Sequence, residues 1–70
     1  MNNDVLLSAG EREELKNIAQ NMPVFAGDTL SHDTVNSLVS KKLALRYEGE
    51  FCLTEYGKII ASDLGYYKIN

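Results

Sequence analysis

The chain has 70 residues and a formal net charge of −3, with 44% hydrophobic and 24% charged side chains, which predicts one globular domain near the lower size limit for a self-sufficient core. One Cys and one His exclude a disulfide framework and a structural zinc site built by this chain. Apolar runs are shorter than the roughly 18 residues of a membrane span, and the first residues lack the pattern of a secretory signal, so we expect a cytoplasmic protein.

The first predicted helix begins at Ser8. Ser8 and Glu11 have the spacing of a capping box, and acidic residues in the first turn suit the positive end of the helix dipole. Pro23 disfavours helical backbone at the preceding residue and predicts the end of the helix. Residues 22–26 then form a short strand or an extended crossing. One apolar face follows from the spacing of Leu15, Ile18, Ala19 and Met22.

A turn at residues 27–29 leaves room for one short helical turn, which Asp28 could cap through Leu30. Ser31 is the stronger cap, for a helix that we expect to extend to Leu43. The predicted buried face of this helix comprises Val35, Leu38, Val39 and Leu43. The predicted outer face comprises His32, Asn36, Ser37, Ser40 and Lys41.

An antiparallel hairpin follows over residues 43–53, and its sequence allows two registers. A two-residue turn at Glu48 and Gly49 would place Arg46 opposite Phe51. A three-residue loop would instead place Tyr47 opposite Phe51. We prefer the second register because it collects the apolar side chains of both strands on one face, and a buried face usually decides register. This choice turns Arg46 and Cys52 toward the less buried side.

Thr54 caps a closing helix, and Gly65 is its predicted C-terminal glycine. Gly57 lies inside this helix, where glycine costs about 1 kcal/mol relative to alanine, and we expect close packing against another element to explain it. The predicted buried face comprises Tyr56, Ile59, Ile60 and Leu64. The tail residues Tyr66, Tyr67 and Ile69 either pack back onto the first helix or form, with that helix, the seam of a homodimer.

Residues 35–46, followed by residues 51–57, resemble the winged helix superfamily of bacterial regulators. The matching residues are Leu38, Lys41, Leu43, Phe51, Leu53, Thr54 and Gly57. The resemblance covers about half of the chain. It implies a small α+β winged helix with three helices and a two-stranded hairpin wing, in a single domain spanning residues 1–70. It also implies binding of duplex DNA in transcription regulation.

Three features depart from the superfamily pattern. Lys42 stands where glycine commonly closes the recognition helix. The helix that normally precedes the turn is reduced or missing. The wing tip carries Glu48 and Glu50, whereas a wing that contacts DNA usually offers Arg or Lys to the phosphates. The last two departures weaken the expectation of ordinary duplex binding.

Basic residues nevertheless gather where a recognition helix would lie, since residues 34–47 contain three cations and no acid. We therefore predict that the helix over residues 31–43 enters the major groove. Side chains of Asn, Ser and Lys contact base edges, and the remaining cations contact phosphates. The predicted base contacts are Asn36, Ser37, Ser40 and Lys41, and the predicted phosphate contacts are Lys42 and Arg46.

The alternative function is an acidic winged helix that docks a basic partner protein without binding DNA, such as an accessory protein of a phage or mobile element. Other candidate sites have plainer explanations. His32 is an exposed neutral side chain, Cys52 a structural residue of a strand, and the acids at 11, 13 and 14 serve the helix dipole and solubility. The chain shows no phosphate loop, nucleophile elbow or metal-ligand spacing. We therefore expect no enzyme activity, cofactor or metal.

Overall fold

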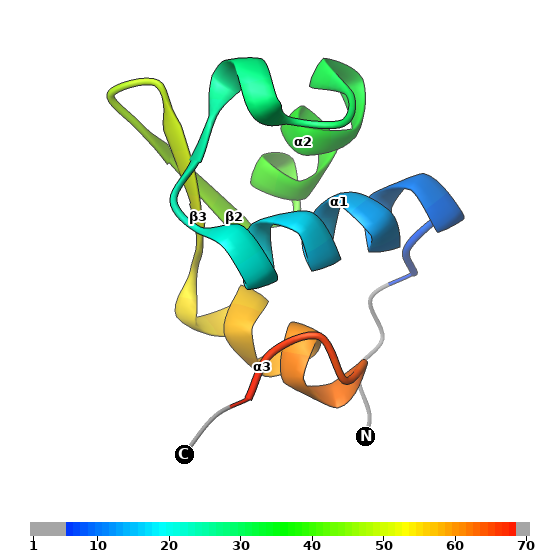
Figure 1. Ribbon diagram of the computed structural model, residues 1–70. Coiled ribbons are helices and arrows are strands. Elements are labelled where there is room, and N and C mark those ends of the chain that lie inside the picture. Colours follow the sequence, from blue (N-terminus) through cyan, green and yellow to red (C-terminus); the bar gives the residue numbers. More distant parts are fainter. Residues whose placement is uncertain (1–5, 69–70) are drawn as a thin grey trace.

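The computed structural model describes residues 6–68. Within them lie three α-helices, a one-turn 3-10 helix and a three-stranded sheet, as expected of a small α+β winged helix (Figure 1). The element order is α1 (Ala9–Asn21), β1 (Val24–Phe25), η1 (Ala26–Asp28), α2 (His32–Ser40), β2 (Ala44–Tyr47), β3 (Glu50–Leu53) and α3 (Glu55–Asp63). No helix in this range is long and apolar enough to cross a membrane.

The three helices begin at the residues predicted from their caps. Ser8 and Glu11 form the expected capping box, in which the Ser8 N–H donates to Glu11 Oε1 at 2.8 Å. The side chains of Ser31 and Thr54 accept hydrogen bonds from the backbone N–H groups of Thr34 and Gly57. Each cap thus satisfies a donor that the helix itself leaves unpaired.

The sheet is antiparallel with the strand order β1-β3-β2, and the hairpin of β2 and β3 projects beyond the helices (Figure 1). Residues 22–26 do contain a short strand, β1, which pairs with β3 and adds a third strand to the expected two-stranded wing. The short 3-10 helix η1 is the helical segment between β1 and α2. A single turn here agrees with the expectation that a helix before α2 is reduced or missing.

The preferred hairpin register was wrong. Arg46 lies opposite Phe51, and Glu48 and Gly49 form a two-residue turn in which both residues have positive φ, 51° and 80°. This geometry matches the right-handed twist of the strands. Tyr47 is therefore on the outer face of the sheet, 71% exposed. The turn geometry decided the register, and small Ala44 occupies the buried position of β2.

The core lies between the helices and the inner face of the sheet. Its buried apolar side chains are Leu15, Ile18, Ala19, Val24, Val35, Leu38, Leu43, Ala44, Phe51, Leu53, Ile60 and Ala61. The buried face of α3 differs from the prediction, because Gly57, Ile60 and Ala61 point inward while Tyr56 and Ile59 are exposed. Helix α3 is thus rotated so that its glycine faces the core.

The explanation for the rotation is a close contact between Gly57 and the chain leading into β2. A Cβ atom at Gly57 would lie 1.9 Å from the carbonyl oxygen of Leu43. The same oxygen accepts a hydrogen bond from the Thr54 N–H at 3.1 Å. The prediction that close packing explains this glycine is confirmed.

Both α2 and α3 end in a Schellman motif, which requires one residue in the left-handed conformation. In α3 that residue is Gly65 (φ 83°), as predicted. In α2 it is Lys42 (φ 66°), and the Leu43 N–H donates to the Leu38 carbonyl at 2.9 Å. Helix α2 therefore ends at Ser40, shorter than the predicted range of 31–43.

Candidate nucleic-acid interface

The six residues predicted to contact DNA divide into two groups. Ser37 and Lys41 face α1 and are half-buried, so the prediction that they lie on the outer face of α2 was wrong. The Ser37 hydroxyl donates to Glu11 Oε2, and Lys41 Nζ lies 2.9 Å from a Glu11 carboxylate oxygen. Lys41 Nζ also donates to the carbonyl of Leu6 at 2.9 Å.

These contacts tie α2 to the start of α1. The Lys41 ammonium, with the Ser37 hydroxyl and the Ser8 N–H, lowers the pKa of Glu11 from 4.5 to about 2. Glu11 is therefore ionised at neutral pH, and it accepts from the N-cap of α1 and from Ser37 and Lys41 at the C-terminal end of α2. The charge of Lys41 is balanced by its ion pair with Glu11, so Lys41 contributes little to a basic surface.

A second buried carboxylate places the start of α2. Glu14 is fully buried, and its Oε1 accepts hydrogen bonds from the N–H groups of Leu30 (2.7 Å) and Ser31 (3.0 Å). Its Oε2 accepts a third from Asn17 Nδ2 at 3.0 Å. Glu11 lies in the first turn of α1 and in the predicted capping box, as expected of an acid that serves the helix dipole, and Glu13 is exposed. The bonds that Glu11 and Glu14 make to the residues of α2 and its N-terminal approach were not predicted from the sequence.

The outer face of α2 presents His32, Asn36 and Ser40, all exposed. Their side chains make no hydrogen bond to any described residue, and polar groups left free in this way are available to a ligand. Asp33, in the first turn, shares this surface and carries a negative charge. The face is thus polar with little positive charge of its own.

Lys42, which follows the C-terminal end of α2, and Arg46, in β2, are exposed cations. Neither forms an ion pair within residues 6–68. The Arg46 guanidinium lies 5.9 Å from the centre of the Phe51 ring, on the inner face of the sheet, and not on the Cys52 side as expected. Cys52 lies on the outer face, opposite Leu45.

The tail residues that the structure describes pack against the core. Tyr66 and Tyr67 are half-buried, and Lys16 Nζ of α1 lies 6.0 Å from the centre of the Tyr66 ring. This agrees with the first alternative, packing onto the first helix. Ile69 lies outside the described residues. No group of three His, Cys, Asp or Glu side chains within residues 6–68 is placed to hold a metal ion.

Comparison with family models, with curated proteins and with solved structures finds no match to this chain.

Proposed function

We propose that this protein is a small winged-helix regulator that binds duplex DNA with the outer face of α2. Asn36 and Ser40 contact base edges, while Lys42 and Arg46 contact phosphates. The observation that carries the proposal is that these four side chains, from α2, its C-terminal end and β2, are exposed without a hydrogen bond or ion pair to any described residue. Ser37 and Lys41, predicted to be contacts, instead hold α2 in place through Glu11.

The conformation of Lys42 supports this role. A left-handed residue costs a non-glycine side chain about 1 kcal/mol or more, and glycine would close α2 without that cost, as Gly65 closes α3. Residues with strained backbone conformations cluster at functional sites. Here the strain places a positive charge at the end of the helix that would enter the groove.

Two available cations set the strength of binding. Neutralising two phosphates gives a slope of log K against log salt of about −2 for one protomer and about −4 for a dimer. Asp33 and the acids of the wing tip oppose this attraction. We therefore expect binding at low salt, weakening steeply as salt is raised.

The test is a titration of a labelled random-sequence duplex, followed by fluorescence anisotropy from about 50 mM salt upward. Lys42→Gly and Arg46→Gln should each weaken binding and reduce the salt slope by about one. Lys58→Ala is the matched control, because Lys58 lies on α3 beside Glu55, 3.5 Å from its carboxylate. Absence of binding at the lowest salt contradicts the proposal, as does equal weakening by the control.

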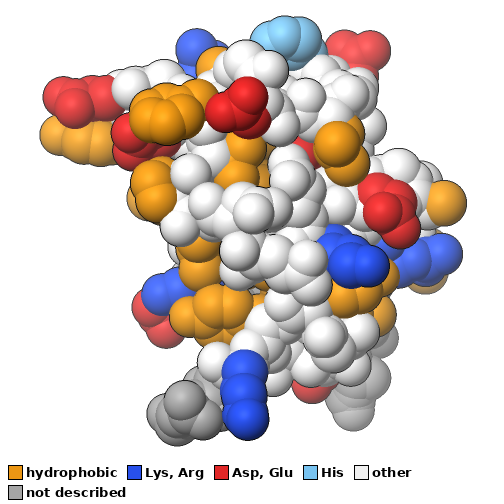
Figure 2. Space-filling model, viewed as in Figure 1, with side chains coloured by type: hydrophobic (Ala, Val, Ile, Leu, Met, Phe, Trp, Pro, Cys, Tyr) orange, Lys and Arg blue, Asp and Glu red, His pale blue; other side chains and the backbone are white. Residues whose placement is uncertain are grey.

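A second candidate function is docking of a basic partner protein. The supporting observation is that the wing tip carries exposed Glu48 and half-buried Glu50 where a DNA-contacting wing offers cations. Figure 2 shows acidic and hydrophobic side chains intermixed over the wing. Stoichiometric capture of a basic protein by a variant that has lost duplex binding supports docking as a separate function. Loss of capture and duplex binding together in Lys42→Gly contradicts it.

A further inference from the structure

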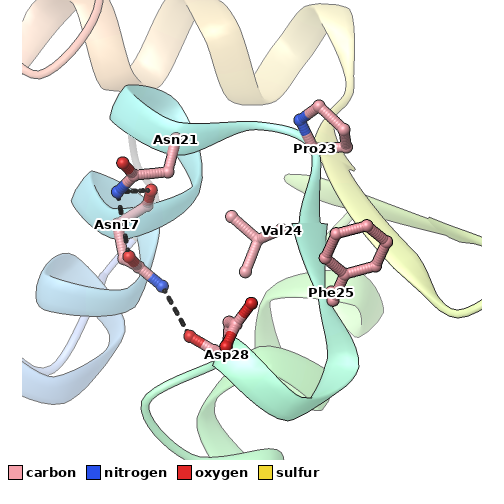
Figure 3. Close-up of a pocket in the computed structure, with 6 residues that line it drawn as sticks. All are labelled: Asn17, Asn21, Pro23, Val24, Phe25 and Asp28. Carbon is pink, nitrogen blue, oxygen red and sulfur yellow. Dashed lines mark hydrogen bonds between the residues drawn. The ribbon is translucent and has the colours of Figure 1, made fainter.

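A cavity of ≈ 330 Å³ opens between the C-terminal half of α1 and the segment formed by β1 and η1. Figure 3 shows its walls: the side chains of Asn17 and Asn21 extend from α1, and the side chain of Val24 points from β1 toward them. The lining residues are Asn17, Asn21, Pro23, Val24, Phe25 and Asp28. The volume is at the lower end of the range for ligand pockets, about 300–1,000 Å³, and suits one long side chain.

The amide N–H donors on the α1 wall are already used. Asn17 Nδ2 donates to Glu14 Oε2 at 3.0 Å and to the Asp28 carbonyl at 3.4 Å. Asn21 Nδ2 donates to the carbonyl and to Oδ1 of Asn17, at 3.0 and 3.1 Å (Figure 3). The Asn21 amide oxygen receives no hydrogen bond from a described residue, and Asn17 Oδ1 receives one, so the capacity left on this wall is to accept hydrogen bonds and not to donate them.

The Asp28 carboxylate lines the same cavity, and no described residue donates to it or pairs with it. Helix α1 ends here without a basic residue in its last turn, so the negative end of its dipole is uncompensated. No Lys or Arg lines the cavity. The Asp28 carboxylate, the amide oxygens of the α1 wall and the negative end of the helix dipole all favour a positively charged hydrogen-bond donor.

We propose that this cavity receives an arginine side chain from a basic segment of a partner protein. A guanidinium has five N–H donors and no acceptor, which matches the Asp28 carboxylate and the amide oxygens of Asn17 and Asn21. The aliphatic part of the side chain can lie against Pro23 and buried Val24. The proposal rests on the second candidate function, protein docking, and not on DNA binding.

The surface beside the cavity suits the rest of such a segment. Phe25 is 57% exposed at the rim and lies opposite Glu50 across the sheet, which lies opposite Tyr47 in turn. A row of two exposed aromatic side chains with a half-buried acid between them favours a partner with both apolar and basic residues. Charge complementarity thus selects a basic protein segment over a second, equally acidic copy of this chain.

The test is an NMR titration of the whole ¹⁵N-labelled protein with a blocked Ala-Arg-Ala tripeptide and with the same peptide containing citrulline. The arginine peptide should shift the amides of residues 17–28 and the side-chain amides of Asn17 and Asn21, with saturation near millimolar concentration, about that of a single weak site. Citrulline, which has the same shape without the charge, should give no saturable shift. Equal shifts from both peptides overturn the proposal.

Variants separate this cavity from general acidity. Asp28→Asn should weaken arginine binding about fivefold, the scale of a partly exposed ion pair, whereas Asp33→Asn, which removes an acid from α2 instead, should leave it unchanged. Asn21→Asp adds a carboxylate to the wall and should strengthen binding. An equal loss in both neutralised variants, or no gain from Asn21→Asp, overturns the proposal.

A third arm distinguishes this proposal from those it accompanies. Hexa-arginine that binds equally well to the wild type and to Asp28→Asn supports acidic docking but overturns the cavity assignment. Lys42→Gly should leave the tripeptide titration unchanged while weakening duplex binding. The DNA proposal and the arginine proposal therefore fail on different variants.

Discussion

Replacing Gly57 with alanine adds one methyl group where α3 crosses the entry to β2. The new Cβ would lie 1.9 Å from the Leu43 carbonyl oxygen and 2.9 Å from its carbonyl carbon. Both neighbours are backbone atoms, so no side chain can rotate away. The oxygen is also held by the Thr54 N–H, and the neighbouring Lys42 carbonyl accepts from the Thr54 hydroxyl at 2.6 Å.

The substitution has two opposing effects on the free energy of unfolding. Alanine inside a helix gains about 1 kcal/mol over glycine. To remove the overlap, α3 must move away from Leu43 by roughly 1 Å or more. Such forced shifts of a packed element cost about 1–3 kcal/mol or more. The Thr54 cap and the packing of Ile60 would move with the helix. We expect a net loss of about 2 kcal/mol, a large share of the ~3–5 kcal/mol available to a domain of this size.

Urea denaturation followed by circular dichroism measures this loss as a lower midpoint for Gly57→Ala. Gly10→Ala is the matched control, because Gly10 also lies in a helix but a Cβ there meets nothing closer than 3.7 Å. The control should gain up to about 1 kcal/mol. If Gly57→Ala is as stable as the wild type, the close approach of α3 to Leu43 is wrong.

Three further substitutions test the polar contacts of α2 and the backbone conformation at its end. The pKa of Glu11 is lowered from 4.5 to about 2, so ionised Glu11 adds its full share to the free energy of unfolding above pH 4.5 and loses it as pH falls toward 2. Because the Lys41 side chain is 36% exposed, solvent screening reduces this share to about 1–2 kcal/mol. Urea midpoints should fall over this pH window less in Glu11→Gln than in the wild type. Glu14→Ala leaves the N–H groups of Leu30 and Ser31 without their acceptor and should cost about 2–3 kcal/mol by urea denaturation, whereas an unchanged midpoint would contradict these bonds. Lys42→Gly should raise the melting temperature, by relieving about 1 kcal/mol of strain, while weakening duplex binding; a lower melting temperature would contradict the left-handed assignment.

Local signals in the sequence predicted where the helices begin. Ser8, Ser31 and Thr54 each cap the helix that they were expected to cap. A cap depends on a side chain and on backbone groups two or three residues away, so the pattern is complete within a short window. Gly57 was also interpretable, because glycine inside a helix has a recognised cost that demands an explanation.

Local sequence patterns did not predict the hydrogen bonds and ion pairs between elements that are distant in the sequence. Periodicity identified the apolar stripe of α2, but it did not show which flanking polar residues would meet α1. Ser37 and Lys41 lie 26 and 30 residues from their partner Glu11. Glu14 is a carboxylate at a fully buried position, which hydrophobic patterning assigns to the surface.

The hairpin register failed for a different reason. The preference for a common apolar face assumed that large apolar residues of β2 would be buried, whereas Leu45 and Tyr47 are 56% and 71% exposed. Two positive φ angles at Glu48 and Gly49 were sufficient to set the other register. Folding alone does not require exposed apolar side chains such as Leu45 and Tyr47 on the outer face of so small a sheet.

The charged residues therefore fall into two groups: those that form bonds between elements of the fold and those that do not. Glu11, Glu14 and Lys41 form bonds between elements, so their charges explain how the helices are held and not what the surface binds. Lys42 occupies a strained position that glycine would fill at lower cost, and Asp28 lines a cavity without a described partner. Side chains that the fold does not need, in places where they cost stability or remain unpaired, are the ones from which binding is best inferred. That reasoning selects two opposite charges in two separate places, which is why a cationic and an anionic ligand are each assigned their own site.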